Sequence, residues 1–261
     1  MTAIRWSRRG FLVAVAGWSC VSLVAPVAEA WGAPDELSVS SGVYGASREQ
    51  RPLFDVNLGG AGHTALLVGG IHGGSETNTV ALVQAMQTAI QIDPGFLPPA
   101  LGLTFLSAAN PDGLADGTRT LANGVDPNRN WPTADWSVDT YVAGPTLVPG
   151  GGGPFPLSEP ETQALAALVT RLRPALIVSY HSAAGLVTGG PRARALGLEA
   201  LYASTAGYAS GDWTAYPVTG DFAQWAEQQQ GIPTIEVELP DHANTDLEAN
   251  LAAVRAVLPR L

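Results

Sequence analysis

Two histidines and one glutamate are spaced in this chain so that they could hold a catalytic metal ion. His72 and Glu76 share a Gly-rich segment that begins at Gly69, and His181 follows an apolar run much later in the chain. Two neutral imidazoles and one carboxylate are a ligand set of catalytic zinc, and they leave a fourth position for water. The metal makes that water a nucleophile near neutral pH. The sequence therefore predicts one Zn²⁺ ion held by His72, Glu76 and His181.

The chain has two further histidines. His63 lies in a Gly-rich turn before an apolar run, and His242 follows Pro240 and Asp241. A single histidine near a strand end is more often a hydrogen-bonded polar residue than a metal ligand. We therefore expect both to be surface loop residues and place neither in the metal site.

Short apolar runs alternate with helical patterns along most of the chain. This alternation predicts an α/β fold in a single domain, with a mixed, mostly parallel twisted sheet and helices on both faces. The predicted ligands then follow strands, and open α/β sheets bind ligands at the carboxyl ends of strands. Strands are expected at residues 37–41, 53–58, 64–68, 101–108, 175–180 and 234–239, and helices at 76–91, 158–172 (opened by a capping box at Ser158), 192–209 and 244–258.

Composition sets further limits on function. The chain has 261 residues, of which 46% are hydrophobic, enough for a buried core in one domain. The net charge of −10 argues against nucleic acid as a partner, because that binding needs a basic surface. Residues 109–157 are rich in Pro, Gly and Asn and show no period. An irregular segment of this length in a compact domain is usually functional.

The first 30 residues are typical of a twin-arginine export signal. Arg8 and Arg9 precede an apolar stretch, which ends at Ala28-Glu29-Ala30, an A-x-A cleavage signal. We expect cleavage after Ala30, a catalytic domain at residues 31–261, and a periplasmic or secreted product. The alternative is a membrane anchor, for which the stretch is short. The only cysteine, Cys20, would leave with the signal, so the mature chain would have no thiol chemistry.

The irregular segment contains Asn110-Pro111-Asp112-Gly113, then Arg119, then Asp126-Pro127-Asn128-Arg129-Asn130-Trp131. With this string the segment 110–131 resembles the zinc carboxypeptidases, and among them the small bacterial branch that includes the murein tripeptide amidases. Further segments fit the resemblance in order: the His72 turn, Ser179-Tyr180-His181-Ser182, Tyr216 to Trp225, and Thr234 to Leu239.

The resemblance implies a role for each matching residue. Asp126 would accept the other ring N–H of His72 and fix its tautomer. Asn128 and Arg129 would hold the terminal carboxylate of the substrate, since a guanidinium binds a carboxylate bidentately. The resemblance further implies that Arg119 stabilises the oxyanion, that Glu238 is the general base, and that Tyr216 is a mobile tyrosine that closes over the substrate.

The metal motif departs from that family in one respect. The family has two residues between the first histidine and the glutamate, and here there are three, namely Gly73, Gly74 and Ser75. Residues four apart can still face the same way across a turn. We therefore keep Glu76 as the carboxylate ligand.

Glu236 lies two residues before Glu238 on the same predicted strand, so both side chains should face the same cleft. Two such carboxylates repel each other unless one is paired or protonated. Glu236 could pair with an arginine or a backbone donor elsewhere. Alternatively, it lies in the pocket for the last side chain of the substrate and attracts an amine of Lys, Arg or diaminopimelate. Asp221 is a second candidate acid, and the resemblance puts the family's usual pocket-floor position near Ala223, which is neutral.

These residues predict an exported zinc metallocarboxypeptidase that cleaves the C-terminal amide bond of peptides with a free carboxylate and favours basic side chains. Two alternatives keep the metal and change the bond: a murein peptide amidase that cleaves γ-D-glutamyl-diaminopimelate, or an N-acyl amino acid deacylase. A third is a non-catalytic module that binds peptide or peptidoglycan ends. We expect a monomer, a peptide or peptidoglycan-peptide substrate, and no stable membrane anchor after signal cleavage.

Overall fold

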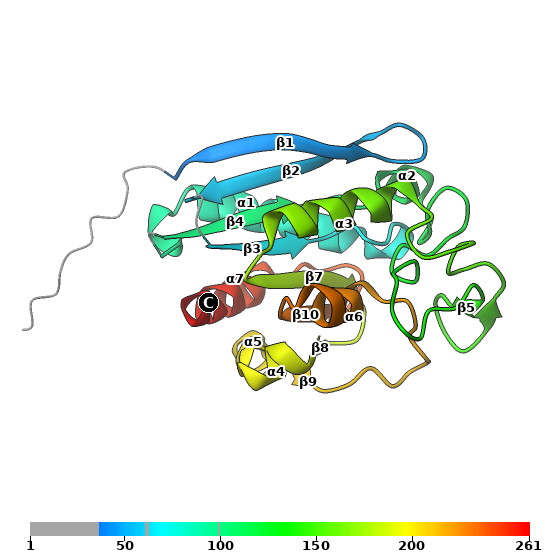
Figure 1. Ribbon diagram of the computed structural model, residues 1–261. Helices are drawn as coiled ribbons and strands as arrows, with labels where there is room; N and C mark the ends of the chain where they lie inside the picture. The colour runs from blue at the N-terminus through cyan, green and yellow to red at the C-terminus, as the bar shows by residue number, and fades with distance from the viewer. Residues whose placement is uncertain (1–36, 61–62, 99) are drawn as a thin grey trace, which may run out of the picture. The chain divides into compact units, whose positions relative to one another are not determined.

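The computed structural model describes residues 37–60, 63–98 and 100–261 (Figure 1). The strands are β1 Val39–Ala46, β2 Pro52–Gly59, β3 His63–Val68, β4 Leu101–Leu106, β5 Thr140–Tyr141, β6 Leu147–Val148, β7 Leu176–Ser182, β8 Leu186–Gly189, β9 Ala209–Ser210 and β10 Thr234–Leu239. The helices are α1 Thr77–Gln91, α2 Pro111–Asp116, α3 Pro160–Leu172, α4 Pro191–Ala195, α5 Leu198–Ala206, α6 Phe222–Trp225 and α7 Leu247–Val257. The 3-10 turns are η1 Gly74–Glu76, η2 Pro94–Phe96 and η4 Leu258–Arg260, and η3 Ala226–Gln230 is a π-helical turn.

One eight-stranded sheet carries the fold, with strand order β1-β2-β4-β3-β7-β10-β8-β9. The central strands β4, β3, β7 and β10 are parallel to their neighbours in this group. Strands β1 and β2 form an antiparallel hairpin, which joins β4 in antiparallel fashion, and β8 joins β10 in the same way. The predicted mixed, mostly parallel sheet is confirmed.

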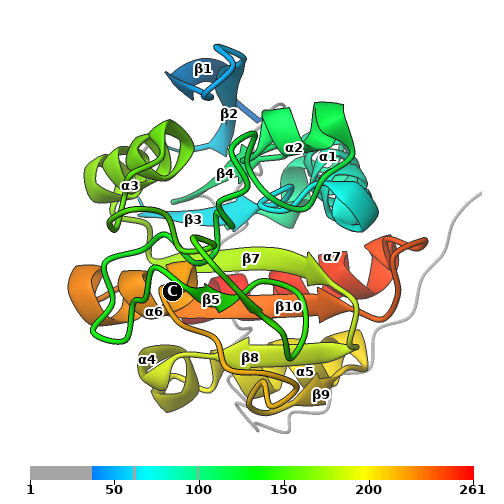
Figure 2. The same ribbon diagram turned by 90° about the vertical axis from the view of Figure 1, so that its right-hand side faces the viewer.

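Alternate residues of the central strands pack into two separate cores, as the period of two requires. On one face Leu67 and Val178 pack with apolar residues of α1, α5 and α7. On the other face Leu66 and Ile177 pack with α3 and α6. Figure 2 shows α1 and α7 on one side of the sheet and α3 and α6 on the other. The predicted cover of helices on both faces is therefore confirmed.

Two helix predictions were wrong in detail. The helix expected at 192–209 is divided into α4 and α5, because Gly197 adopts a left-handed conformation with φ of 68°. The capping box expected at Ser158 does not form: α3 begins at Pro160 after Glu159, and the Ser158 hydroxyl donates to the Glu159 carboxylate instead. Strand β8 was not predicted. The segment 109–157 is mostly irregular, with only α2, β5 and β6 within it.

The predicted export signal at residues 1–30 lies outside the described residues. Within the described ranges, no helix combines the length and the apolar character that a membrane crossing requires.

Candidate active site

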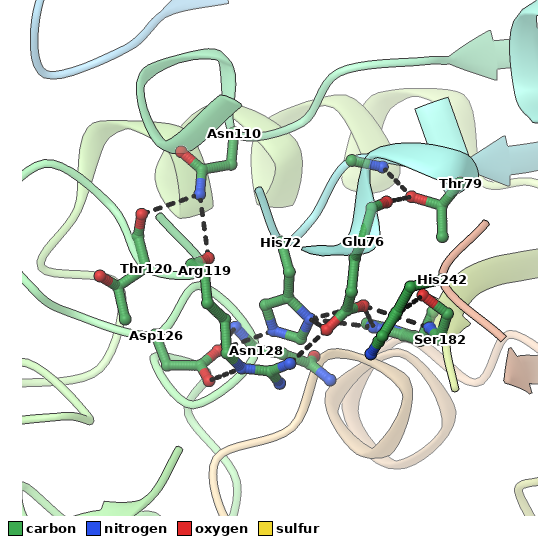
Figure 3. A network of polar contacts seen from close by, with 12 residues as sticks. His72, Glu76, Thr79, Asn110, Arg119, Thr120, Asp126, Asn128, Ser182 and His242 are labelled. Atoms are coloured by element: carbon green, nitrogen blue, oxygen red, sulfur yellow. Dashed lines mark hydrogen bonds and ion pairs between the residues drawn. The ribbon is translucent and has the colours of Figure 1, made fainter. Parts of the chain in front are cut away.

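The side chains of His72, Glu76 and His181 meet at the carboxyl ends of β3 and β7. Figure 3 shows the His72 ring next to the Glu76 carboxylate. The Nδ1 atom of His72 lies 3.2 Å from Nδ1 of His181 and 3.1 Å from a carboxylate oxygen of Glu76. The Nδ1 atom of His181 lies 3.5 Å from Oε2 of Glu76. Tetrahedral zinc with bonds of about 2.0–2.1 Å needs ligand atoms about 3.4 Å apart. The three donors therefore have the chemistry and the spacing of a zinc site.

The backbone around His72 explains how the ligand pair tolerates an extra residue. Gly73 lies so close to the chain at Gly113 that an added Cβ would be 2.4 Å from that carbonyl oxygen. Gly74 has φ of 62°, which a residue with a side chain rarely adopts. The chain then closes the short 3-10 turn η1, and Glu76 N–H donates to the Gly73 carbonyl at 3.3 Å. This turn returns the Glu76 carboxylate to His72, as expected for the four-residue spacing.

Asp126 lies behind His72, as the resemblance implied. It is fully buried, and His72 Nε2–H donates to its Oδ1 at 3.0 Å. Burial acts to raise the pKa of Asp126, but His72 and Arg119 outweigh it and hold that pKa well below its usual range. Because the proton of His72 is committed to Nε2, Nδ1 is left with its lone pair toward the other ligands.

Arg119 contacts the carboxylates of both Asp126 and Glu76. Its Nε donates to Asp126 Oδ2 at 3.3 Å, and its Nη1 hydrogen-bonds Glu76. The Arg119 side chain is 24% exposed. It thus borders both the metal ligands and the open space next to them.

A cavity of about 420 Å³ opens on this centre and collects the other predicted residues. Glu238 reaches it from β10, and burial raises the pKa of its carboxyl group, although the His181 ring opposes this. Tyr216 lies in the loop before α6, with its ring 5.2 Å from that of Trp213 in an edge-to-face arrangement. The cavity is lined by His72, His181, Arg119, Asn128, Arg129, Tyr216, Asp221, Ala223, Glu236 and Glu238, among others.

Two backbone carbonyls hold the guanidinium of Arg129 in place. Its Nε donates to the Tyr141 carbonyl at 2.9 Å, and its Nη1 donates to the Asn128 carbonyl at 2.7 Å. The residue is only 2% exposed, yet it lines the cavity. A guanidinium has five N–H donors, so others remain for a ligand in the cavity. A rigid, buried cation of this kind suits a substrate carboxylate.

Asn128 links two acids. Its Nδ2 lies 3.1 Å from Asp221 Oδ2 and 3.4 Å from Glu236 Oε1, while its Oδ1 accepts from Phe222 N–H at 3.0 Å. Burial and the neighbouring Asp221 raise the pKa of Glu236 to about 8. The prediction that Glu236 shares the cleft with Glu238 is confirmed. The alternative prediction, that Glu236 pairs with an arginine, was wrong. Within the described ranges Glu236 contacts Asn128 instead and lies 3.7 Å from His181 Nε2.

Three residues near the centre, Ser179, Ser182 and His242, were not predicted as part of the site. Nε2 of His181 lies 3.0 Å from Ser179 Oγ. If Nδ1 of this ring binds the metal, Nε2 holds the proton and donates it to that hydroxyl. His242 is exposed, as expected, but its Nδ1 lies 2.8 Å from Ser182 Oγ, beside the metal ligands (Figure 3). Ser182 directly follows a predicted ligand, and His242 lies four residues after Glu238, so both had a weak positional signal.

Comparison with known proteins agrees with this geometry. Residues 38–192 match the family model described as zinc carboxypeptidase. The chain is 37% identical over 146 residues to murein peptide amidase A of Escherichia coli K12, an alignment that covers 53% of this chain and 57% of that protein. It is 30% identical over 206 residues to murein peptide amidase A of Vibrio campbellii, covering 74% of this chain and 76% of that protein. The chain thus matches little more than half the length of its E. coli relative.

Solved structures show the same likeness. The crystal structure of murein-tripeptide amidase from E. coli O157 superposes with a TM-score of 0.65 and 26% identity, over 91% of this chain and 97% of that one. Thrombin activatable fibrinolysis inhibitor superposes with a TM-score of 0.69 and 18% identity, over 87% of this chain and 69% of that one. At that identity the likeness concerns the fold.

Proposed function

This chain belongs to the zinc carboxypeptidase family, and we propose that it is an amidase of cell-wall peptides that cleaves the γ-D-glutamyl–diaminopimelate bond. The observation that carries the proposal is one cavity in which the His72 metal centre, the Arg129 guanidinium and the acids Asp221 and Glu236 meet. The first can activate water, the second can hold a terminal carboxylate, and the acids can hold an amine. The similarity to murein peptide amidases supports the same substrate.

The chemistry follows from the groups around the cavity. His72, Glu76 and His181 would hold the zinc ion, which would act as a Lewis acid toward the scissile carbonyl and lower the pKa of bound water. Glu238 accepts a proton from the attacking water and passes it to the nitrogen of the leaving amine as the carbon–nitrogen bond breaks. Arg119 donates hydrogen bonds to the negative charge that develops on the carbonyl oxygen.

The carboxylate clamp sets the position of the substrate. Arg129, with Asn128 beside it, binds the free carboxylate next to the scissile amide. Tyr216 lines the same cavity and closes over the bound residue. Because Arg129 is buried and its plane is fixed by two backbone carbonyls, a substrate without that carboxylate leaves a buried cation unpaired.

The acid pair distinguishes between substrates. Diaminopimelate has a second amino group at the far end of its side chain, and an ammonium there would neutralise Asp221 and Glu236. A C-terminal lysine or arginine would satisfy the same acids, so a carboxypeptidase for basic residues is the second candidate. An N-acyl amino acid lacks such a group unless it is itself basic. A purely binding module is disfavoured, because the metal ligands and Glu238 are all present.

One panel of substrates tests the proposal. Hydrolysis would be compared for the γ-D-glutamyl-diaminopimelate tripeptide, ordinary peptides ending in Lys, Arg or Leu, and N-acyl amino acids. We expect the highest kcat/KM for the murein tripeptide, loss of activity on chelation, and recovery with zinc. A preference for C-terminal Lys or Arg would favour the second candidate. Activity that survives complete metal removal would overturn both.

We further propose that the protein is exported by the twin-arginine pathway and acts as a monomer in the periplasm or outside the cell. The arginine pair and the A-x-A signal before Trp31 support export. N-terminal sequencing of the mature protein and light scattering would test these two points. A mature protein that retains Arg8 and Arg9 would contradict cleavage.

A further inference from the structure

A ring of hydrogen bonds joins three separate segments beside the metal ligands. His242 Nδ1 lies 2.8 Å from Ser182 Oγ, and Ser182 Oγ lies 3.0 Å from Asn78 Oδ1. Asn78 Nδ2 donates to the carbonyls of Asp241 at 2.7 Å and Asn244 at 2.9 Å. The ring therefore runs from the loop after β10, through the end of β7 and the start of α1, and back to the same loop.

The direction of each hydrogen bond in the ring follows from the donors and acceptors available. Backbone carbonyls only accept, so the amide nitrogen of Asn78 must face Asp241 and Asn244, and Asn78 Oδ1 faces Ser182. The single proton of the Ser182 hydroxyl then goes to Asn78 Oδ1. Ser182 Oγ is left as the acceptor for His242, which must hold its proton on Nδ1. A side chain that presents an N–H at this point can therefore replace the imidazole.

The ring touches the metal centre through one backbone group. Ser182 N–H donates to Glu76 Oε2 at 3.3 Å, while Arg119 holds the other oxygen, Oε1. Asn78 lies two residues after Glu76, and Ser182 directly follows the ligand His181. Any movement of the β7 end relative to the start of α1 would therefore move the carboxylate of Glu76 relative to His181.

We propose that His242, Ser182 and Asn78 are positioning residues that fix the orientation of the carboxylate of the metal ligand Glu76. They hold the ends of β7 and α1 at one separation, so that the Ser182 N–H directs Oε2 of Glu76 toward the two imidazoles. This ligand needs such support because its turn has one residue more than the family pattern. The inference rests on the metal-binding triad and is independent of which peptide bond is cleaved.

Zinc affinity tests the proposal without an assay of turnover. The zinc dissociation constant would be measured by competition with a chromophoric chelator for the full mature chain and its variants. His242→Ala and Ser182→Ala should each weaken zinc binding about tenfold, the low end of the range for groups that orient metal ligands. The zinc dissociation constant of His242→Asn should lie within about threefold of that of the unchanged chain, because the amide N–H of Asn can replace the Nδ1–H of His242.

Two further measurements separate positioning from a general loss of stability. The visible spectrum of the cobalt-substituted protein reports the geometry at the ligands, and it should change in His242→Ala and return in His242→Asn. Glu248→Ala is the matched control, since Glu248 is exposed in the first turn of α7, close in sequence to this loop. It should change neither the zinc affinity nor the cobalt spectrum.

If His242→Ala lowers the melting temperature of the metal-free chain but leaves zinc affinity and the cobalt spectrum unchanged, the ring is merely structural and the proposal is overturned. His242 is exposed, so this variant decides the matter even where Ser182→Ala does not fold.

Discussion

Glu238 lies directly opposite His181 in the parallel pair of strands β10 and β7. In the same register Glu236 lies opposite Ser179, whose Oγ is 3.0 Å from Nε2 of the His181 ring. Because Val237 packs into the core with α1, α5 and α7, the two glutamates face the opposite side, where the cavity lies. A slip of one residue would turn both carboxylates into that core, so the register of one strand pair places Glu238, the proposed general base, beside a metal ligand.

Glu238→Gln should remove turnover while leaving the metal in place. The amide has nearly the same shape but cannot accept a proton from water, so kcat should fall by a factor of about 10²–10⁴. Steady-state kinetics on the murein tripeptide would measure the fall, and metal analysis should still find one zinc per chain. A variant that keeps full kcat would exclude Glu238 as the base.

Arg129→Lys should weaken binding of the substrate carboxylate. Lysine keeps the charge but cannot present the planar pair of N–H donors, so kcat/KM should fall about 10- to 100-fold for substrates with a free terminal carboxylate. The matched control is the same peptide with a terminal amide, whose slow hydrolysis should change little. An equal loss on both substrates would instead indicate general damage to the cavity.

Glu236→Gln should selectively impair substrates that have an amine in the last side chain. The loss of one carboxylate should lower kcat/KM about tenfold for diaminopimelate or lysine substrates, with little change for leucine. Asp221→Asn is the companion variant: Asp221 accepts from Gln224 N–H at the start of α6, and Asn can keep that cap. Equal losses on basic and neutral substrates in both variants would contradict the assignment of the acid pair.

Glu161→Gln should stabilise the protein at neutral pH. Burial raises the pKa of Glu161, although a hydrogen bond from Arg48 N–H opposes it. Its Oε2 is buried and has no hydrogen-bond partner among the residues that the structure describes. The pKa of Glu161 is therefore higher in the folded state than in the unfolded state, so the folded state binds more protons at pH values between the two. The free energy of unfolding falls as pH rises through that window.

Thermal unfolding of both chains over a pH series measures this effect. The glutamine variant should melt higher than the unchanged chain at neutral pH, and the difference should disappear below the unfolded pKa of about 4.3. A difference that is constant across the series would show that charge at position 161 is not the cause.

Most of the sheet could be predicted from local patterns, because apolar runs such as 64–68 are buried whatever lies beside them. Helix boundaries were less predictable. The break between α4 and α5 depends on the left-handed conformation of Gly197, and a glycine within a helical pattern does not by itself require one. The capping box at Ser158 failed because Pro160 begins α3 one residue later than that box requires.

The metal ligands could be predicted from residue types and their order, because a zinc site requires particular functional groups that few side chains supply. The proposed general base, Glu238, followed only from the resemblance to the zinc carboxypeptidases. How those groups are supported emerged only when distant segments met. Asn128 contacts Asp221 and Glu236, which both lie more than ninety residues after it in the chain. His242 reaches Ser182 from a loop that has no motif. Such contacts depend on how strands and loops pack in three dimensions, and no local pattern of residues encodes that packing.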